Sequence, residues 1–518
     1  MHEIELKFQV PAAQRAAVDT AVAGRASQRR VRLQAAYCDT AQRALAKARL
    51  ALRVRREGQR WVQTLKGGTG DGMTRLEHNV ALGRGAGPAT EPPAADPALH
   101  AGTPAGARLF AALGCGTDGS PSASSAAGEP LTVLYRTDIL RRTRIQRSAL
   151  GKVELAFDTG SITAGEAKLA VHELEVELLA GSALAVIDVS RRWLRRFGLW
   201  LDTRSKSERG DMLARGETMA PPRTATDVDL TPRMSGMQAL RCVLGSCADQ
   251  VLGNASQIAS GEHTDEHVHQ LRIGLRRLRT ALQLFDGPAD PLPAGPASLA
   301  AAAAMLFRRL GAARDQVVIE AGFAADLQAA LQAAGVSGAG PRATASGTEE
   351  APDVVLREVV SQGLLLDLLA ATQAADPAVA LAAPVEEPGL RHQLAARLNR
   401  WHRRAAADAE RYRMLDDAGR HRLRKHVKRL RYALEFSGAL FPRRAVRRYL
   451  AALRAAQERL GAINDVVVAM EAFKRSRDTD PRAWFALGWL AARRELLLAQ
   501  ALPDLKKFAA AKPFWKGG

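Results

Sequence analysis

The sequence predicts an α+β chain with a β-rich first part and an all-α second part. Before residue 216, charged and apolar residues alternate, as in His2-Glu-Ile-Glu-Leu-Lys-Phe8 and His172-Glu-Leu-Glu-Val-Glu-Leu178. This period of two is typical of β-strands. After residue 233 the sequence is rich in Ala and Leu, with Arg at spacings of three and four, which is typical of amphipathic helices. Since 518 residues exceed the size at which one hydrophobic core stops growing, we expect separate domains.

We assign residues 1–215 to the β-rich domain, 216–233 to a proline-containing linker and 234–510 to the helical domain. The helical domain is a duplication, because His269–Leu282 recurs as His421–Leu434 and Leu310–Asp315 recurs as Leu460–Asp465 at nearly the same separation. The two repeats therefore cover about 234–335 and 353–510. Residues 83–130 and 336–352 are rich in Gly, Ala, Pro and Ser, so we expect surface or flexible segments that bury little apolar area.

The charge balance favours a polyanionic partner. A formal charge of +20 and a pI near 10.5 suit nucleic acid, an anionic membrane or a phosphate polymer. Aromatic residues make up only 5% of the chain, which disfavours nucleic acid, because single-strand binders stack bases on aromatic rings. Charges begin at Glu3 and no apolar run reaches the ~20 residues of a spanning helix. We therefore expect a cytoplasmic protein without a membrane partner.

The charged faces of the predicted strands carry both signs. Glu3, Glu5 and Lys7 share one face because residues i, i+2 and i+4 of a strand point the same way. The opposite faces are apolar and need covering, and residues 182–200 are predicted to form one covering helix. If the apolar faces lie outside, the charged faces converge on an interior that only a charged ligand can neutralise. Carboxylates suit Mg²⁺ or Mn²⁺, and cations suit phosphate oxygens, so this combination favours phosphoryl transfer.

The motif Glu3-Ile-Glu-Leu-Lys7 is an ExExK sequence, and it is followed in order by further segments of similar character. These segments are Tyr37–Thr40, Leu52–Arg55, Thr64–Gly67, Arg75–Glu77, Val153–Asp158, Glu173–Glu177 and Ser205–Gly210. Together they resemble the CYTH family of triphosphate tunnel metalloenzymes over residues 1–215. The resemblance implies an eight-stranded antiparallel β-tunnel that binds a triphosphate and a divalent metal. Members of the family hydrolyse inorganic or thiamine triphosphate, or cyclise ATP.

The resemblance also implies roles for individual residues. The catalytic residues are Glu3, Glu5, Lys7 and Lys206, and the metal ligands, for Mg²⁺ or alternatively Mn²⁺, are Glu3, Glu5, Asp158, Glu173, Glu175 and Glu177. The triphosphate ligands are Lys7, Arg53, Arg55, Lys66, Arg75, Arg141 and Lys206. Arg142 is an alternative to Arg141, because the register of that strand is open. Asn79 stands where the family often has another acid, which leaves a metal role for that strand in doubt.

Basic residues form a stripe on each copy of the repeated helix, beside a stripe of Leu and Val. The stripes comprise His269, Arg272, Arg276 and Arg279 in the first copy and His421, Arg424, Lys428 and Arg431 in the second, with Lys425 adding charge. Two stripes that face each other make a cationic groove for a long polyanion. The duplicated helix resembles the CHAD family, which implies binding of inorganic polyphosphate. We therefore expect these nine residues to bind polyphosphate and the protein to associate with polyphosphate granules.

The leading hypothesis is hydrolysis of inorganic triphosphate in the first domain, with polyphosphate bound by the second. Hydrolysis of a nucleoside or thiamine triphosphate is an alternative, because the cationic residues recognise only phosphate. A non-enzymatic polyphosphate-binding scaffold is another alternative, and the intact ExExK motif speaks against it. A nucleic-acid binder is the least favoured, since Tyr432 is the only aromatic residue within the basic stripes.

Overall fold

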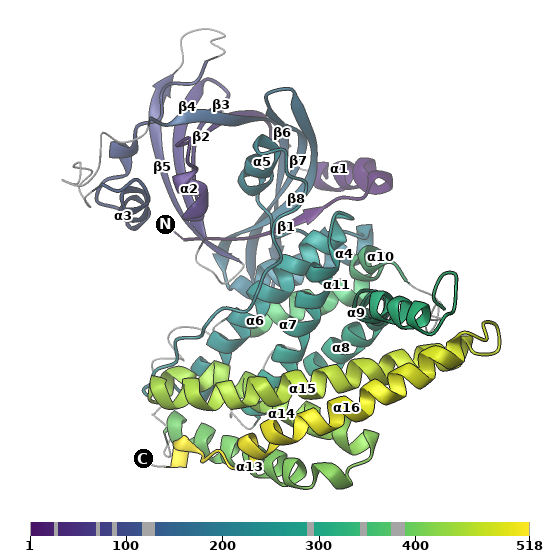
Figure 1. The fold of residues 1–518 in the computed structure, drawn as a ribbon. Helices are drawn as coiled ribbons and strands as arrows, with labels where there is room; N and C mark the ends of the chain where they lie inside the picture. The colour runs from purple at the N-terminus through teal and green to yellow at the C-terminus, as the bar shows by residue number, and fades with distance from the viewer. Residues whose placement is uncertain are drawn as a thin grey trace. The chain divides into compact units, whose positions relative to one another are not determined.

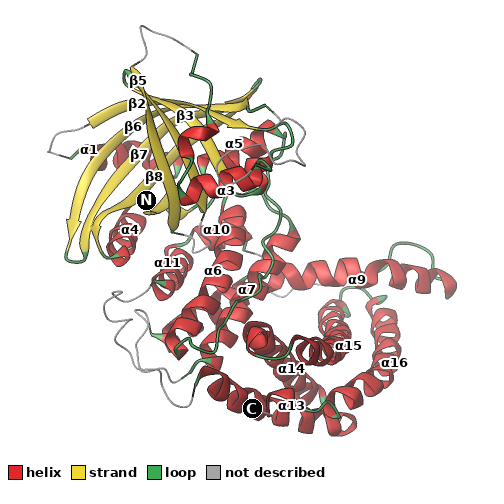
Figure 2. Ribbon diagram, turned by 90° about the vertical axis from the view of Figure 1, so that its left-hand side faces the viewer, coloured by secondary structure: helices red, strands yellow, loops and turns green. Residues whose placement is uncertain are grey.

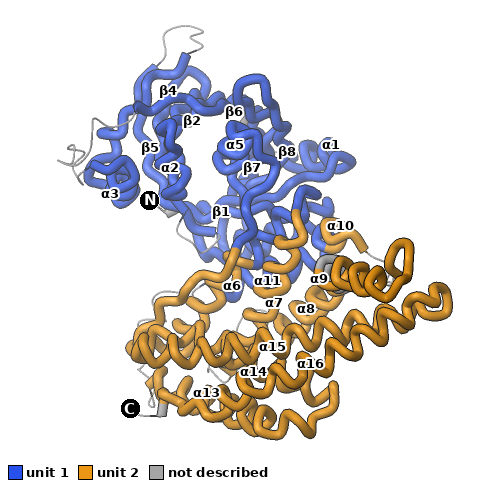
Figure 3. Tube along the Cα trace, viewed as in Figure 1, with its two compact units in different colours: residues 1–223, 251–263, 356–376 blue, residues 224–250, 264–355, 377–518 orange. Residues whose placement is uncertain are grey.

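The computed structural model of the chain describes residues 2–24, 29–68, 73–84, 91–115, 130–286, 295–341, 350–373 and 389–516. It forms an N-terminal β-barrel and a set of long helices (Figure 1). The chain divides into two compact units (Figure 3). Unit 1 comprises Met1–Arg223, Val251–His263 and Leu356–Asp376, and unit 2 comprises Thr224–Gln250, Thr264–Val355 and Pro377–Gly518. No helix of the described segments has both the length and the apolar character that crossing a bilayer requires.

Unit 1 is built on a closed antiparallel barrel. The ring of eight strands runs β1-β5-β4-β3-β2-β6-β7-β8 and closes through β8–β1 pairing, while β9 pairs with β1 outside the ring. This topology confirms the predicted eight-stranded antiparallel tunnel. The strands are β1 (His2–Gln9), β2 (Arg29–Asp39), β3 (Leu50–Glu57), β4 (Arg60–Gly68), β5 (Thr74–Arg84), β6 (Thr132–Ser148), β7 (Gly151–Ala164), β8 (Ala167–Gly181) and β9 (Trp200–Leu201).

Helix α4 (Ala183–Phe197) covers the outside of β1 and β8, as the apolar segment 182–200 predicted. It begins where the Ser182 side chain accepts a hydrogen bond from the Leu184 backbone N–H at 3.2 Å. It ends at Gly198, whose φ of 58° lies in the left-handed region. The helix buries Val186 and Leu194, and the outward residues Leu6 and Phe8 of β1 are buried too. Burial of each such side chain contributes roughly 1.5–3 kcal/mol.

Helix α3 (Pro104–Ala112) corrects the expectation that residues 83–130 bury little apolar area. Leu109 of this helix is fully buried and packs with Leu50, Leu52 and Leu65 of β3 and β4. The short 3-10 helix Pro97–His100 precedes it. Residues 85–90 and 116–129 of the predicted surface segment lie outside the described residues. The Ala- and Pro-rich composition of residues 83–130 therefore did not indicate that α3 covers the barrel.

Helix α5 (Lys206–Ala214) packs against the inward-facing residues at one end of the barrel. A capping box starts it, because Glu208 N–H donates to the Ser205 side chain at 3.1 Å and Ser205 N–H donates to the Glu208 carboxylate at 2.8 Å. A Cβ at Gly210 would lie 2.3 Å from the Tyr135 ring, so only glycine allows this approach. An apolar cluster that includes Tyr135, and Leu213 beside it, fills this end of the interior.

Unit 2 consists of helices (Figure 2). The repeated segments form α7 and α14, which pack against each other as a duplicated bundle requires. The described helices in this region are α6 (Gly236–Ala259), α7 (Asp265–Leu284), α8 (Pro296–Arg309), α9 (Gly311–Ala333), α10 (Pro352–Arg357), α13 (Leu390–Glu410), α14 (Asp417–Ser437), α15 (Arg443–Ser476) and α16 (Ala483–Ala509). The copies differ at the Leu-Gly-Ala motif, because α8 and α9 separate at Leu310 whereas Leu460 lies inside the continuous α15.

Unit 1 also contains α11 (Val359–Thr372) and the C-terminal end of α6, both from the stretch assigned to the helical domain. Arg191 of α4 donates to Asp367 of α11 at 2.6 Å, and the Leu201 backbone N–H donates to Gln362 at 2.8 Å. The compact unit around the barrel is therefore not continuous in sequence. The domain boundaries expected at residues 215 and 234 remain predictions.

Candidate active site

A cavity of about 660 Å³ lies inside the barrel. Its walls come from the inward faces of the strands and from the start of α5. All seven predicted triphosphate ligands line it, as do five of the six predicted metal ligands. The sixth, Glu173, is fully buried beside Lys206 and Arg209. The predicted ionisable residues that line the cavity are Glu3, Glu5, Lys7, Arg53, Arg55, Lys66, Arg75, Arg141, Asp158, Glu175, Glu177 and Lys206.

Strand register explains why these charges meet. Antiparallel pairing places Glu5 opposite Glu177 and Lys7 opposite Glu175 between β1 and β8. Because directly opposed residues point to the same side of a sheet, each pair faces the interior together. The pairing of β6 with β7 places Arg141 opposite Asp158, which decides between Arg141 and Arg142. Arg141 faces the cavity, whereas Arg142 points to the other side and forms an ion pair with Asp19 at 3.0 Å.

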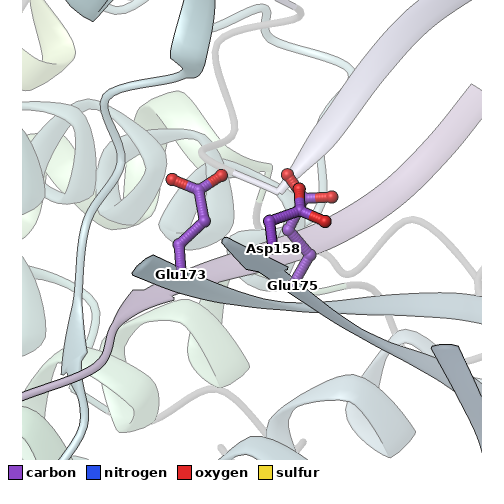
Figure 4. Close-up of side chains that lie close together, drawn as sticks. All are labelled: Asp158, Glu173 and Glu175. Carbon is purple, nitrogen blue, oxygen red and sulfur yellow. The ribbon is translucent and has the colours of Figure 1, made fainter. Parts of the chain in front are cut away.

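One part of the site holds three carboxylates matched by three cations. Asp158, Glu173 and Glu175 each offer an oxygen within 4.8 Å of the others, and Figure 4 shows the Asp158 and Glu175 carboxylates together with Glu173 to one side. Arg141 donates to both oxygens of Asp158 at 2.7 Å, Lys206 contacts all three acids, and Arg209 pairs with Glu173. Burial alone lowers the pKa of Lys206, but the three acids raise it well above its usual range. These carboxylates are already neutralised.

Glu3 of β1 and Glu177 of β8 are less well neutralised than Glu5, because burial raises the pKa of Glu5 but Lys7, Lys66 and Arg75 lower it to about 2. Burial, with Glu5 and Glu77, raises the pKa of Glu3 to about 8, although Lys66 opposes the shift. Burial, with Glu5, Glu175 and Glu154, raises the pKa of Glu177 to about 7. Carboxylate oxygens are the donors that a hard divalent cation prefers. A divalent cation would offset the repulsion that raises the pKa of Glu3 and Glu177, so the residues present fit a metal near these two better than at the cation-filled Asp158 cluster.

Arginines on β3 supply the opposite charge. Burial and the nearby Arg53 and Arg141 lower the pKa of Arg55 to about 10, while Glu57 opposes the shift. Arg53 donates to the Tyr37 hydroxyl at 3.4 Å. The Nε atoms of Arg53 and Arg55 are buried without a hydrogen-bond partner in the described part of the chain. Buried donors without acceptors indicate that an anion belongs beside them.

Three charged residues of the site did not enter the predicted set. Arg209 lies one turn after Lys206 on α5, and the i, i+3 spacing could have revealed it. Glu77 follows Arg75 on the same strand face, and its carboxylate contacts Lys66 at 2.8 Å. Glu154 lines the cavity on β7. Asn79, which departs from the family pattern, donates to Glu77 at 2.8 Å and so orients an acid instead of replacing one.

The basic stripes of α7 and α14 meet in unit 2. Burial, Arg276 and Arg424 lower the pKa of Lys428 to about 6, against the opposing effect of Asp465. Lys425, Arg424 and Lys428 also add to burial in lowering the pKa of His421, whose ring lies 3.2 Å from Asn464. A close group of cations from both copies is therefore present.

Other members of the stripes have contacts within the protein. Arg272 donates to the carbonyl groups of Leu310 and Gly311 at 2.9 and 3.0 Å, and Arg431 pairs with Glu435 at 2.9 Å. Arg279 lies near Arg429, whose pKa falls through burial and through Arg404 and Arg279. His269 is half-buried on α7. The structure thus brings together Arg276, Arg424 and Lys428, and gives Arg272 and Arg431 a structural contact.

Comparisons with known proteins agree with this geometry. The family model of the CYTH domain matches residues 1–210, and that of the CHAD domain matches residues 242–474. An inorganic triphosphatase from Haemophilus influenzae is 27% identical over 180 residues, which cover 34% of this chain and 44% of that protein. The match spans less than half the length of that relative.

Solved structures show similarity to each part. The CHAD domain of Ricinus communis shares 30% identity, covering 56% of this chain and 96% of that one, with a TM-score of 0.41. An adenylyl cyclase candidate from Hippeastrum with a dominant triphosphatase activity shares 18% identity, covering 42% and 98%, with a TM-score of 0.29. The chain therefore belongs to the CYTH family in its N-terminal barrel and to the CHAD family in its C-terminal helices.

Proposed function

We propose that the barrel hydrolyses inorganic triphosphate with the help of Mg²⁺ or Mn²⁺. The observation that carries this proposal is that one cavity holds Arg53 and Arg55, whose Nε atoms lack an acceptor among the described residues, together with Glu3 and Glu177, whose pKa values are raised by burial and by neighbouring acids. A metal-bound triphosphate satisfies both groups at once. Neither a bare anion nor a bare cation does so.

The cations bind and orient the substrate. Arg53, Arg55 and Arg141 present guanidinium groups to phosphate oxygens, and Lys7, Lys66, Arg75 and Lys206 add charge around the same cavity. Hydrolysis adds water across a P–O–P bridge and yields pyrophosphate and phosphate. Charge accumulates on the bridging oxygen as that bond breaks, so preorganised cations stabilise the transition state.

The carboxylates serve the metal. Glu3, Glu5 and Glu177 would hold it, with Glu175, Asp158 and Glu173 in support through their cation partners. A bound divalent ion neutralises phosphate oxygens and lowers the pKa of a coordinated water. Glu3 and Glu5 then act in catalysis by placing that charge, and Lys7 and Lys206 by orienting phosphate beside it.

The cavity favours an inorganic substrate over a nucleoside or thiamine triphosphate. Among its described lining residues, Tyr37 supplies the one aromatic ring apart from the His78 imidazole. The Tyr37 ring is stacked on Tyr135 at 4.7 Å between centroids, so that face is not available to a base. An organic group would gain little beyond its phosphates.

A substrate panel tests the proposal. Phosphate release by the full chain from inorganic triphosphate, ATP and thiamine triphosphate should be compared in Mg²⁺ and in Mn²⁺. We expect the highest kcat/KM with inorganic triphosphate. Turnover of an organic triphosphate alone would show that the assignment is wrong, and no turnover of any substrate would favour the scaffold.

We propose further that the joined stripes of α7 and α14 bind inorganic polyphosphate, which would bring the protein to polyphosphate granules. Replacing Arg276, Arg424 and Lys428 together by Gln removes the central charges while sparing Arg272, which supports the α8–α9 junction. Polyphosphate affinity at fixed salt should fall at least about 100-fold, because cation contacts dominate polyanion binding.

The matched control removes the same charge elsewhere. Arg443, Arg444 and Arg447 are exposed at the start of α15, and their replacement by Gln should change affinity only slightly. Equal losses in the two triple variants would show that net charge, and not the stripes of α7 and α14, binds the polymer. RNA of equal charge serves as the competitor that tests the nucleic-acid alternative.

A further inference from the structure

The four residues that precede catalytic Lys206 are held by a helix outside the CYTH match. Asp202–Ser205 connects β9 to α5, and Lys206 is the first residue of α5. The anchoring groups are Ser256 and Gln257 near the end of α6 and Ser260 just after it. Val251–His263 belongs to the same compact unit as the barrel. These contacts therefore lie within one compact unit of the protein.

Asp202 joins this connection to the ExExK strand. Its backbone N–H donates to the Lys7 carbonyl at 2.9 Å, and its carboxylate accepts from the Gln9 side chain at 3.1 Å. Arg204 donates to the same carboxylate from Nε and Nη2, both at 2.9 Å. Asp202 is 1% exposed. A buried, two-point ion pair thus fixes the backbone two residues before Lys206.

The remaining Arg204 nitrogen reaches α6. Nη1 donates to the Gln257 side-chain oxygen Oε1 at 3.3 Å and to the Ser260 hydroxyl at 3.4 Å. The Thr203 backbone N–H donates to the Ser256 hydroxyl at 3.0 Å. The Gln257 side-chain oxygen also accepts from Ala220 N–H at 3.1 Å, and its amide donates to the Glu262 carbonyl at 2.5 Å. Gln257 is thus locked in one orientation with its oxygen toward Arg204.

We propose that Gln257 and Ser260 are positioning residues for Lys206, acting through Arg204. The inference rests on the proposed triphosphatase function and adds that the active site is incomplete without the end of α6. Lys206 sits within contact distance of three carboxylates at once, so a small rotation of α5 changes which of them it neutralises. A misplacement of about 1 Å can reduce catalysis ~100-fold.

The test compares variants of the full chain on inorganic triphosphate. Gln257→Ala should lower kcat/KM by about 10- to 100-fold, and Ser260→Ala should lower it less. Gln257→Glu keeps an oxygen acceptor for Arg204 and should restore most of the activity. Gln250→Ala is the matched control, since Gln250 is equally buried on the same helix but donates to Gln270. It should lower Tm comparably while leaving kcat/KM unchanged.

A double-mutant cycle with Lys206→Ala tests whether Gln257 affects catalysis through Lys206. If Gln257 acts through Lys206, Gln257→Ala causes no further loss in the Lys206→Ala background. Full additivity, or wild-type kcat/KM in both Gln257→Ala and Ser260→Ala, overturns the positioning role while leaving the triphosphatase intact. A wild-type chain without triphosphatase activity refutes the proposed function itself, and the positioning role with it.

Discussion

Lys428 should take up a proton when polyphosphate binds. Its pKa of about 6 results from burial and from Arg276, Arg424 and Arg431, with Asp465 opposing them. At pH 8 this value leaves only about 1% of the side chain charged. A polyanion favours the ammonium form and raises the pKa toward its ordinary range. Binding at pH 8 should therefore consume about one proton per chain through this residue.

The sign of the pH dependence follows from the same linkage. Below pH 6 Lys428 is already charged, and binding needs no proton from it. Above pH 6 each unit of pH makes protonation about tenfold harder, so affinity should fall about tenfold per unit until the pKa of the complex is reached. Measurements at pH 8 and above also avoid the titration of His421, whose pKa lies below its ordinary value through burial and the nearby Lys425.

Calorimetry measures this uptake directly. Long-chain polyphosphate is titrated into the full chain at pH 8 and fixed ionic strength, in two buffers of different ionisation enthalpy. The Lys428→Met variant should lose the proton uptake, whereas Lys425→Met, which removes an exposed lysine three residues earlier, should retain it. Equal uptake by the wild type and Lys428→Met, or an affinity that does not change between pH 7 and 9, would refute the reasoning.

Three further predictions concern the barrel. Burial and His78 lower the pKa of fully buried His100 to about 4 from its ordinary 6.5. Because the unfolded chain binds the proton more readily, the free energy of unfolding should fall by ~2 kcal/mol from pH 8 to pH 5. In denaturant titrations His100→Gln should flatten this pH dependence, whereas exposed His392→Gln should not. Arg209→Leu removes a buried partner of Glu173, and destabilisation of ~3 kcal/mol is expected from the denaturation midpoint; a loss below about 0.5 kcal/mol would contradict the buried ion pair. Leu109→Ala should cost ~2–5 kcal/mol by the same measurement, and a change near zero would mean that α3 does not cover the barrel.

The alternation of charged and apolar residues along single strands allowed the charged interior of the barrel to be predicted. Inward positions on β1 follow from the period of two alone, because Glu3, Glu5 and Lys7 must share a face. The eight-stranded antiparallel tunnel did not follow from that pattern but was implied by the family resemblance, and the order of strands around the ring needed the structure. Register on β6 also needed the structure, since Arg141 and Arg142 are adjacent and equally basic.

Local sequence patterns did not predict contacts between residues that are distant in the sequence. The composition of the Gly- and Ala-rich segment that precedes α3 is that of a linker. Leu109 of α3 nevertheless packs in a hydrophobic core with residues of strands that are distant in the sequence. Arg272 matched the basic stripe by spacing, but its hydrogen bonds to Leu310 and Gly311 give it a structural contact. The joining of α11 to the barrel unit through Asp367 and Gln362 depends on tertiary packing that no periodicity encodes.

The division of the acids into two groups also required coordinates. By residue type Glu173, Glu175 and Glu177 are identical and equally spaced on β8. Arg209 and Lys206 of α5 neutralise the first two, whereas Glu177 remains crowded by other acids. Which glutamate suits a metal therefore depends on the position of a helix from another part of the chain.

Phosphate release from inorganic triphosphate by the wild type and Glu5→Gln, with Mg²⁺ and after chelation, tests the central claim most directly. Glu166→Gln, on the exposed β7–β8 turn, provides a control with the same charge change. We expect Mg²⁺-dependent release by the wild type and Glu166→Gln, and a loss of at least about 100-fold in Glu5→Gln. Release by Glu5→Gln at the wild-type rate, or release that survives chelation, would contradict a metal-dependent triphosphatase in the barrel.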